Sequence, residues 1–252
     1  MSEPLKKPAD GLTPSLVQKL LKAWQGLEGL ALLKAVLRSD EDINIAVSSS
    51  FGAESAVLLD LIAQVDASTP VLTVDTGKLF DETHAYRDRL VDHFGLGDVR
   101  VLEPHWGLVH GADPEGALHQ SNPDLCCQVR KVMPHAEATA AFDVLITGRK
   151  RFHGGLRDEL PAVHVEGHHI KINPLAAWDS ADLERAFVER ELPRNPLVAE
   201  GYRSIGCATC TFKTGQGEGV RAGRWAGKEK TECGIHLAAN DIFNIEALEN
   251  GQ

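Results

Sequence analysis

Apolar residues recur along the chain in two patterns, short uninterrupted runs and longer stretches with helical spacing. The short runs are typical of buried strands, and they lie at 44–47, 71–74, 99–102 and 144–148, with a further strand ending at 171–175. Helical spacing covers 14–27, 29–38, 56–62, 82–94 and 179–191. Because strands and helices alternate, the sequence predicts an α/β fold with an open, mostly parallel, doubly wound sheet.

Three of the predicted strands end in turns of small, polar or basic residues, at 48–55, 75–77 and 147–151. Ligands bind beyond the carboxyl ends of strands in such sheets, so we expect these turns to meet at one edge. The first turn precedes a helix, and its backbone N–H groups together with the helix N-terminus would cradle an anion. An ordinary strand–helix turn capped by serines is the alternative. The basic run of the third turn, with Arg157 nearby, supplies cations for the same ligand.

The composition is that of a soluble globular protein with an acidic balance. The 252 residues are 43% hydrophobic and 25% charged, with a formal net charge of −10. This charge argues against a nonspecific nucleic-acid or membrane binder, so an anionic substrate requires a local basic patch. We see no signal peptide and no membrane-spanning run, and therefore expect a cytoplasmic protein. We divide the chain into N-terminal helices (1–40), a nucleotide-binding α/β domain (41–200) and a C-terminal segment carrying the nucleophile (201–252).

The five cysteines fall into an adjacent pair (Cys126 and Cys127), a CxxC motif (Cys207 and Cys210) and the single residue Cys233. Four thiolates suit a tetrahedral zinc or an iron–sulfur centre, and counting cysteines does not separate the two. A reducing compartment disfavours a disulfide framework, and the polar residues before the pair argue against a plain apolar-core role. Cys233 remains as a nucleophile on a glycine-rich tail that we expect to be mobile and to close over a site.

Taken together, these residues resemble the assimilatory phosphosulfate reductase family, and specifically its iron–sulfur branch, the adenylylsulfate (APS) reductases. The resemblance extends from Ile43 to His236. It is carried by SSFGAE at 49–54, VDTG at 74–77, CCQVRK at 126–131, KINPL at 171–175, GCATCT at 206–211 and ECGIH at 232–236. The cysteine set together with the ECGIH tail is highly specific. The resemblance implies an adenine nucleotide α-hydrolase-like fold and a [4Fe-4S] cluster bound by Cys126, Cys127, Cys207 and Cys210.

The resemblance also implies a reaction at Cys233. Its thiolate attacks the sulfur of bound APS, AMP leaves, and thioredoxin or glutaredoxin releases sulfite from the S-sulfonate. Arginine and lysine charges near the thiol would favour the thiolate and neutralise the substrate. His236 would help to orient or deprotonate the thiol, with a plain surface histidine as the alternative. The substrate-binding residues that the resemblance implies are Ser49, Ser50, Phe51, Gly52, Val74, Lys131, Gly148, Arg157, Arg221, Arg224 and His236.

Two features depart from many relatives. Many relatives have an Arg-Arg-x-Gln-Ser pattern where this chain has residues 149–155, so the side-chain contacts of 152–155 do not follow from the resemblance. We also find no thioredoxin-like domain of the kind that plant relatives carry, and therefore expect a separate donor protein. Reduction of the 3′-phosphorylated substrate, PAPS, is the nearest alternative, although typical PAPS reductases lack the cluster cysteines. An ATP-dependent pyrophosphatase-type ligase leaves the ECGIH tail unexplained, and an iron–sulfur or zinc redox sensor leaves the nucleotide pocket unexplained. The sequence leaves the oligomeric state open, with a homo-oligomer among the alternatives.

Overall fold

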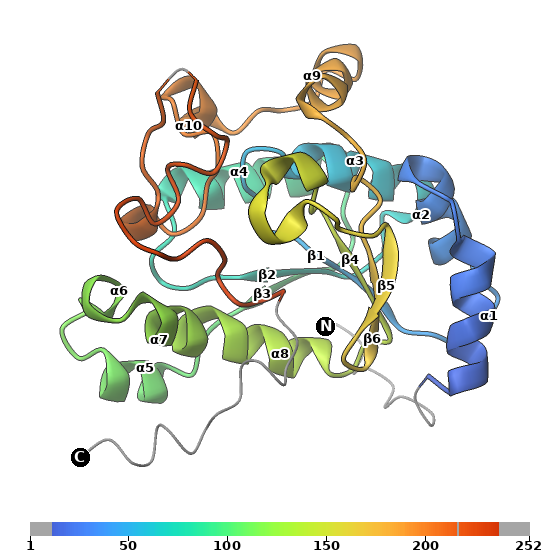
Figure 1. Ribbon diagram of the computed structural model, residues 1–252, viewed down its shortest axis with the longest axis horizontal. Coiled ribbons are helices and arrows are strands. Elements are labelled where there is room, and N and C mark those ends of the chain that lie inside the picture. Colours follow the sequence, from blue (N-terminus) through green and yellow to red (C-terminus); the bar gives the residue numbers. More distant parts are fainter. Residues whose placement is uncertain (1–11, 216, 237–252) are drawn as a thin grey trace.

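A six-stranded sheet runs through the middle of the molecule, with helices on both of its faces (Figure 1). The computed structural model describes residues 12–215 and 217–236. The strands are β1 (Ile45–Ser48), β2 (Val71–Val74), β3 (Val99–Leu102), β4 (Val144–Thr147), β5 (Val163–Glu166) and β6 (His169–Ile172). Their order is β3-β2-β1-β4-β6-β5, and only the β5–β6 pair is antiparallel. The predicted open, mostly parallel α/β sheet is therefore confirmed.

The two central strands, β1 and β4, define where a ligand can enter. Val47 of β1 is in register with Val71 of β2 on one side and with Ile146 of β4 on the other. All three are fully buried, because helices cover both faces of the sheet. From β1 the chain proceeds outward to β3 and then returns to the opposite side of β1 to form β4. The strand order thus reverses between β1 and β4, which is where doubly wound sheets bind ligands.

Helices α3 (Ser55–Asp66) and α4 (Asp81–Phe94) cover one face of the sheet, and α7 (Pro123–Cys127) and α8 (Met133–Thr139) lie on the other (Figure 1). The remaining helices are α1 (Pro14–Trp24), α2 (Gly29–Leu37), α5 (Trp106–Ala112), α6 (Leu118–Ser121), α9 (Ser180–Glu189) and α10 (Pro196–Ala199). Trp24 of α1 and Leu33 of α2 belong to the same hydrophobic core as Val47 and Ile146. The first two helices therefore pack into the core of the sheet, and the boundaries at 40 and 200 stay a prediction.

The sequence analysis did not predict the helices between residues 106 and 139. The polar stretch before the cysteine pair is α6 followed by Asn122, whose side chain accepts a hydrogen bond from Leu125 N (3.0 Å) and so caps α7. Cys126 is 7% exposed and Cys127 is half-buried, so the first cysteine of the pair is buried although polar residues precede it. The reason is that α7 turns one face inward although the residues before it are polar.

Between Tyr202 and His236 the described chain is mostly loop. It contains a 3₁₀ turn, η4 (Ala208–Cys210), and an isolated bridge between Thr211 and Arg224. Figure 1 shows this segment in red, passing from α10 toward the middle of the sheet. This segment is mostly loop, as expected from its many glycines. The parts of the predicted N-terminal and C-terminal segments at 1–11 and 237–252 lie outside the described residues. None of the helices of the described chain is long and apolar enough to cross a membrane.

Candidate active site and cysteine cavity

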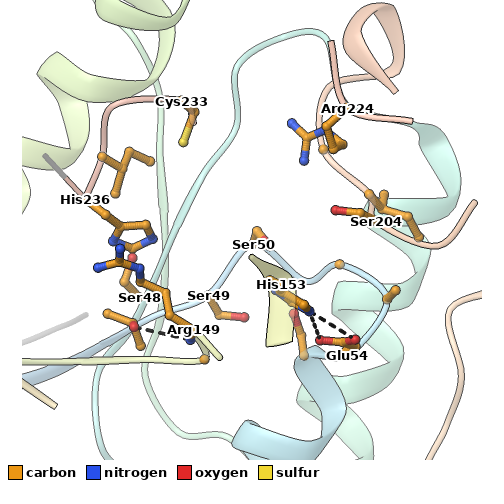
Figure 2. A pocket seen from close by; sticks show the side chains of 18 of the residues that line it. Ser48, Ser49, Ser50, Glu54, Arg149, His153, Ser204, Arg224, Cys233 and His236 are labelled. Atoms are coloured by element: carbon orange, nitrogen blue, oxygen red, sulfur yellow. Dashed lines mark hydrogen bonds and ion pairs between the residues drawn. The ribbon is translucent and has the colours of Figure 1, made fainter. Parts of the chain in front are cut away.

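A pocket lies at the carboxyl ends of β1 and β4, where the strand order reverses. Its walls come from the turn after β1, the turn after β4 and the C-terminal segment. Figure 2 shows Cys233 and His236 on one side of it and Arg224 on the other, with Ser49 and Ser50 between them. Cys233 and ten of the eleven predicted substrate-binding residues line this pocket. The ten are Ser49, Ser50, Gly52, Val74, Lys131, Gly148, Arg157, Arg221, Arg224 and His236.

Phe51 is the predicted residue that does not line the pocket. Its side chain is 1% exposed and belongs to the hydrophobic core. Its φ is +47°, a left-handed conformation that is uncommon for a residue with a side chain. Phe51 N donates to Ser49 Oγ (3.3 Å), and Phe51 O accepts from the buried Asn195 Nδ2 (3.4 Å). The strained backbone therefore anchors the turn in the core while the serines on its other side face the pocket.

Of the five arginines that line the pocket, Arg203 donates to Glu218 O (2.9 Å), and the other four fall into a paired and an unpaired set. Arg157 and Arg221 both bind the carboxylate of Glu232. Arg149 and Arg224 have no ion-pair partner within residues 12–215 and 217–236, and the Nε of each is buried without a hydrogen-bond partner there. Two guanidinium groups that form no ion pair within these residues are suited to hold an anionic ligand.

The basic run after β4 was expected to form one cationic patch, and it does not. Arg149 and Lys150 both line the pocket, but Lys150 is 3% exposed and its Nζ lies 2.7 Å from Glu54 Oε2. Arg151 donates from Nε to Leu160 O (2.9 Å) and does not line the pocket. The side chains of three successive basic residues thus have three different surroundings, and the first of them keeps its charge available.

Two histidines also border the pocket, His135, which is buried, and His236, which is half-buried. His135 Nε2 lies 2.8 Å from Ser48 Oγ, at the end of β1. Burial, with Lys171 and His169 adding to it, lowers the pKa of His135 to about 3. Burial and the charge of Arg149 hold the pKa of His236 well below its ordinary value, and its Nδ1 has no hydrogen-bond partner in the described chain. Both rings are therefore neutral at physiological pH.

Several lining residues were not predicted, and the signals for them differ. Glu54 and Glu232 lie inside the quoted motifs, so attention to the neighbours of the predicted residues would have included them. Arg149 was expected at the ligand only as part of the basic run. His135 carried no signal, because the helix α8 that positions it was itself not predicted.

The four cysteines expected to bind a metal centre line a second, smaller cavity. Cys126 and Cys127 come from α7, and Cys207 and Cys210 come from the 3₁₀ turn η4 and the residue before it. All are free thiols. Thr76, from the turn after β2, places its Oγ1 3.3 Å from Cys207 Sγ. The second predicted turn, at 75–77, thus faces the cysteines through Thr76.

Lys131 connects the two cavities. It follows the cysteine pair on a π-helical turn, η1 (Gln128–Val132), and it lines both the pocket and the cysteine cavity. Burial works against its charge, yet Cys207 and Cys233 lie close enough to raise the pKa of Lys131. Its neighbour Arg130 donates to Thr76 O (3.0 Å) and to Asp113 Oδ2 (2.8 Å), which fixes the turn between the cavities.

The four thiols fit the ligand chemistry of an iron–sulfur cluster. Such a cluster takes one thiolate at each of its irons. Four thiols converging on one cavity, with no carboxylate or histidine among its lining residues, have the soft chemistry that such a cluster requires.

Fold and pocket together define an α/β enzyme that can bind an anionic nucleotide beside a cysteine thiol. The chain belongs to the phosphoadenosine phosphosulfate reductase family, because the model of the phosphoadenosine phosphosulfate reductase domain matches residues 44–213. The family predicted from the sequence is confirmed, and with it the class of enzyme, an oxidoreductase.

Relatives agree with this assignment. The chain is similar to an adenosine 5′-phosphosulfate reductase of Mesorhizobium japonicum, with 50% identity over 221 residues, 85% of this chain and 86% of the relative. It is also similar to a phosphoadenosine 5′-phosphosulfate reductase of Gloeobacter violaceus, with 36% identity over 91% of this chain and 97% of that one. The crystal structure of the phosphoadenylyl-sulfate reductase of Candida auris aligns with a TM-score of 0.64 and 25% identity, over 82% of this chain and all of that one.

Proposed function

We propose that the enzyme reduces adenosine 5′-phosphosulfate to sulfite and AMP in sulfate assimilation. The observation that carries this proposal is the position of Cys233, which lines the same pocket as the serine-rich turn and the unpaired Arg149 and Arg224. The 50% identity with a relative named adenosine 5′-phosphosulfate reductase supports APS as the substrate. In this proposal the turn at 49–52, with Val74 and Gly148, binds the adenosine monophosphate part.

In the first step the Cys233 thiolate attacks the sulfur of the sulfate group. A bond forms between Cys233 Sγ and this sulfur as the bond from the sulfur to the bridging oxygen breaks, and AMP leaves with the electron pair. Arg224, Arg149 and Lys131 would neutralise the charge that develops on the phosphate. Arg157 and Arg221, which the resemblance also assigns to the substrate, line the pocket but bind Glu232. His236 would orient the thiol or accept its proton through its unpartnered Nδ1.

In the second step a dithiol protein, thioredoxin or glutaredoxin, attacks Cys233 Sγ. Sulfite leaves with the electron pair of the S–S bond, and a mixed disulfide forms between donor and enzyme. The second thiol of the donor then attacks the donor's own sulfur in this disulfide, so the donor ends as a disulfide and Cys233 returns to a thiolate. The two electrons that reduce the sulfur thus come from the donor. A compartment with reduced thioredoxin, such as the cytoplasm, is the setting that this step requires.

We further propose that Cys126, Cys127, Cys207 and Cys210 hold a [4Fe-4S] cluster. When bound, the cluster would tie α7 to the segment around η4 and contribute its charge to the electrostatics of the neighbouring pocket. Lys131 lines both cavities, so its ammonium group would interact with the cluster on one side and with the substrate on the other.

Mass spectrometry of the anaerobically purified protein tests the proposal. Mixing with APS, before any reductant is added, should add one SO₃ to the peptide that contains Cys233, and the C233S variant should gain none. Reduced thioredoxin should then remove the adduct and release sulfite. No adduct with APS or PAPS, from protein with its cysteine cavity intact, would overturn the proposal and favour an ATP-dependent ligase.

The same experiment with PAPS tests the substrate. The Gloeobacter violaceus and Candida auris relatives are named for the phosphorylated substrate, so the comparison matters. An adduct with APS alone supports the proposal as stated. Equal rates of Cys233 sulfonation by APS and PAPS would support the same mechanism, but they would show that the enzyme accepts both nucleotides.

A further inference from the structure

The carboxylate directly before the nucleophile is held by two arginines. Arg157 Nε and Nη2 donate to Glu232 Oε1 (2.6 Å) and Oε2 (2.9 Å), which is the bidentate geometry of a strong arginine–carboxylate pair. Arg221 Nη2 donates to Glu232 Oε2 (3.3 Å) and also to Thr231 O (2.8 Å). The side chains of Arg157 and Glu232 are only 8% and 10% exposed. Residues 231–232 are therefore fixed by two different segments of the chain.

Arg157 is itself tied to the nucleotide side of the pocket. It ends a 3₁₀ turn, η3 (Gly155–Arg157), and its Nη1 lies 3.3 Å from His153 Nδ1. The other nitrogen of this ring, Nε2, lies 3.1 Å from Glu54 Oε2, in the turn that follows β1 (Figure 2). His153 lies in the stretch where this chain departs from many relatives. A continuous set of polar contacts thus extends from Glu54 to the residue before Cys233.

The chain on the other side of Cys233 is also constrained. Gly234 has a φ of +93°, and a Cβ at this position would lie 3.1 Å from Val132 Cγ2. The backbone therefore passes close to the η1 turn directly after the nucleophile. With Glu232 held on one side and Gly234 packed on the other, the position of the thiol depends on both neighbours.

From this geometry we propose that Glu232 is a positioning residue, which through Arg157 and Arg221 keeps the Cys233 thiol directed into the pocket. The inference rests on the proposed function, because it concerns how the thiol reaches the substrate sulfur. The alternative is that Glu232 occupies the place of a substrate anion and competes with it. The two possibilities differ in one measurable respect, since a positioning residue affects the rate of sulfonation and a competitor affects substrate binding.

The test is E232Q, which keeps the shape of the side chain and removes its charge. The rate of sulfonation in a single turnover with saturating APS should fall by about 100-fold, the loss typical of a reacting group displaced by about 1 Å. The dissociation constant for AMP should change by less than about threefold, a free-energy difference below about 0.7 kcal/mol. E229Q removes the same charge from an exposed position three residues earlier and should behave like the wild type.

A second readout separates positioning from misfolding or loss of the thiolate. Alkylation of Cys233 by iodoacetamide should be at least as fast in E232Q as in the wild type, because a released tail exposes the thiol. Slower alkylation together with slower sulfonation would show a less reactive thiol and would overturn the positioning role. Tighter AMP binding with an unchanged rate of sulfonation would establish the competing role instead.

A double-mutant cycle tests whether the effect passes through the ion pair. If Glu232 acts through Arg157, then R157Q/E232Q should be about as slow as the slower single variant, because both remove one interaction. Losses that multiply would overturn the pairwise account. A wild type that APS does not sulfonate would refute the proposed function itself, whereas a sulfonated wild type with an equally fast E232Q refutes only this inference.

Discussion

Lys150 Nζ lies 2.7 Å from Glu54 Oε2, and this ion pair joins the turns that follow the two central strands. Lys150 also donates to Gly148 O (2.9 Å), and His153 approaches the same carboxylate. Burial alone would raise the pKa of Glu54, but the neighbouring Lys150 and His153 lower it to about 2. Glu54 is therefore ionised at neutral pH, and its ion pair with Lys150, whose own pKa is lowered by burial, connects two parts of the pocket wall.

We expect E54Q to be strongly destabilised, because it leaves a buried ammonium without its anion. The free energy of unfolding should fall by about 3–5 kcal/mol, the range for breaking a buried pair by removing one partner. The double variant E54Q/K150M removes both charges and should recover most of this loss. Urea unfolding at pH 7 measures all three proteins. E41Q, which removes the carboxylate of the surface pair with Lys19, should leave the urea midpoint nearly unchanged because solvent screens this pair.

The burial of His135 predicts how stability depends on pH. The folded-state pKa of His135 is about 3, well below the ordinary value of 6.5. Below pH 6.5 the unfolded chain binds a proton at this residue and the folded chain does not, so acid favours unfolding until the pH approaches 3. This residue should contribute a slope of about 1.4 kcal/mol per pH unit between pH 6 and 4.

Comparison with H135Q isolates this proton. The difference in unfolding free energy at pH 7.5 reports packing and the Ser48 hydrogen bond, and only its change with pH reports the titration. H135Q should therefore lose stability more slowly than the wild type as the pH falls from 6 to 4. Parallel curves for the two proteins would show that folded His135 accepts its proton at an ordinary pH.

Strands β2 and β4 could be predicted because their residues are mostly buried. Val71–Val74 and Val144–Thr147 read as uninterrupted apolar runs, and their ends were placed within about one residue. The site could be predicted as far as it follows from the strand ends, since the reversal between β1 and β4 brings Ser49 and Gly148 together. The motifs added the tail, with Cys233 and His236, which no periodic pattern would have placed.

The rest depended on information that is not local. Helices α5 to α8 are each of four to seven residues, too short to show a full apolar stripe, so the positions of Cys126 and His135 could not be predicted. Pairings within a cationic pocket also depend on the folded geometry. Arg157 and Arg149 look alike in the sequence, yet one binds Glu232 and the other has an unpartnered Nε in the described structure.

Gly223 lies where the C-terminal segment folds back on itself, and it offers a test of how Arg224 is placed. A Cβ at this position would lie 2.1 Å from Phe212 O, across the bridge between Thr211 and Arg224. G223A must therefore displace the backbone next to Arg224. We expect the rate of sulfonation to fall by roughly 10- to 100-fold, because a displacement of about 1 Å in a positioning residue costs up to two orders of magnitude.

G219A provides the matched control for this substitution. Gly219 lies in the same segment, a Cβ there would meet nothing within 4 Å, and its backbone is not left-handed. Cys233 of the G219A variant should be sulfonated by APS at the wild-type rate. If G223A also reacts at that rate, the position of Arg224 does not depend on this contact.

The four cysteines of the second cavity predict a specific pattern of iron content. Protein purified without oxygen should contain about four irons per chain, the content of one [4Fe-4S] cluster. Each of C126S, C127S, C207S and C210S should lose most of this iron, because serine replaces a soft thiolate with a harder oxygen ligand. C233S should retain it, since Cys233 does not line that cavity.

Stability gives a readout of the cluster that does not depend on activity. A centre that ties α7 to the segment around η4 should stabilise the fold, so chelation of the iron should lower the thermal midpoint of the wild type. The same treatment should leave C207S unchanged, because that variant has no iron to lose. One zinc per chain and no iron would contradict the cluster, and full iron in C207S would remove that residue from the ligand set. Since C233S keeps its iron but cannot form the S-sulfonate, it separates the metal centre from the nucleophile in one protein.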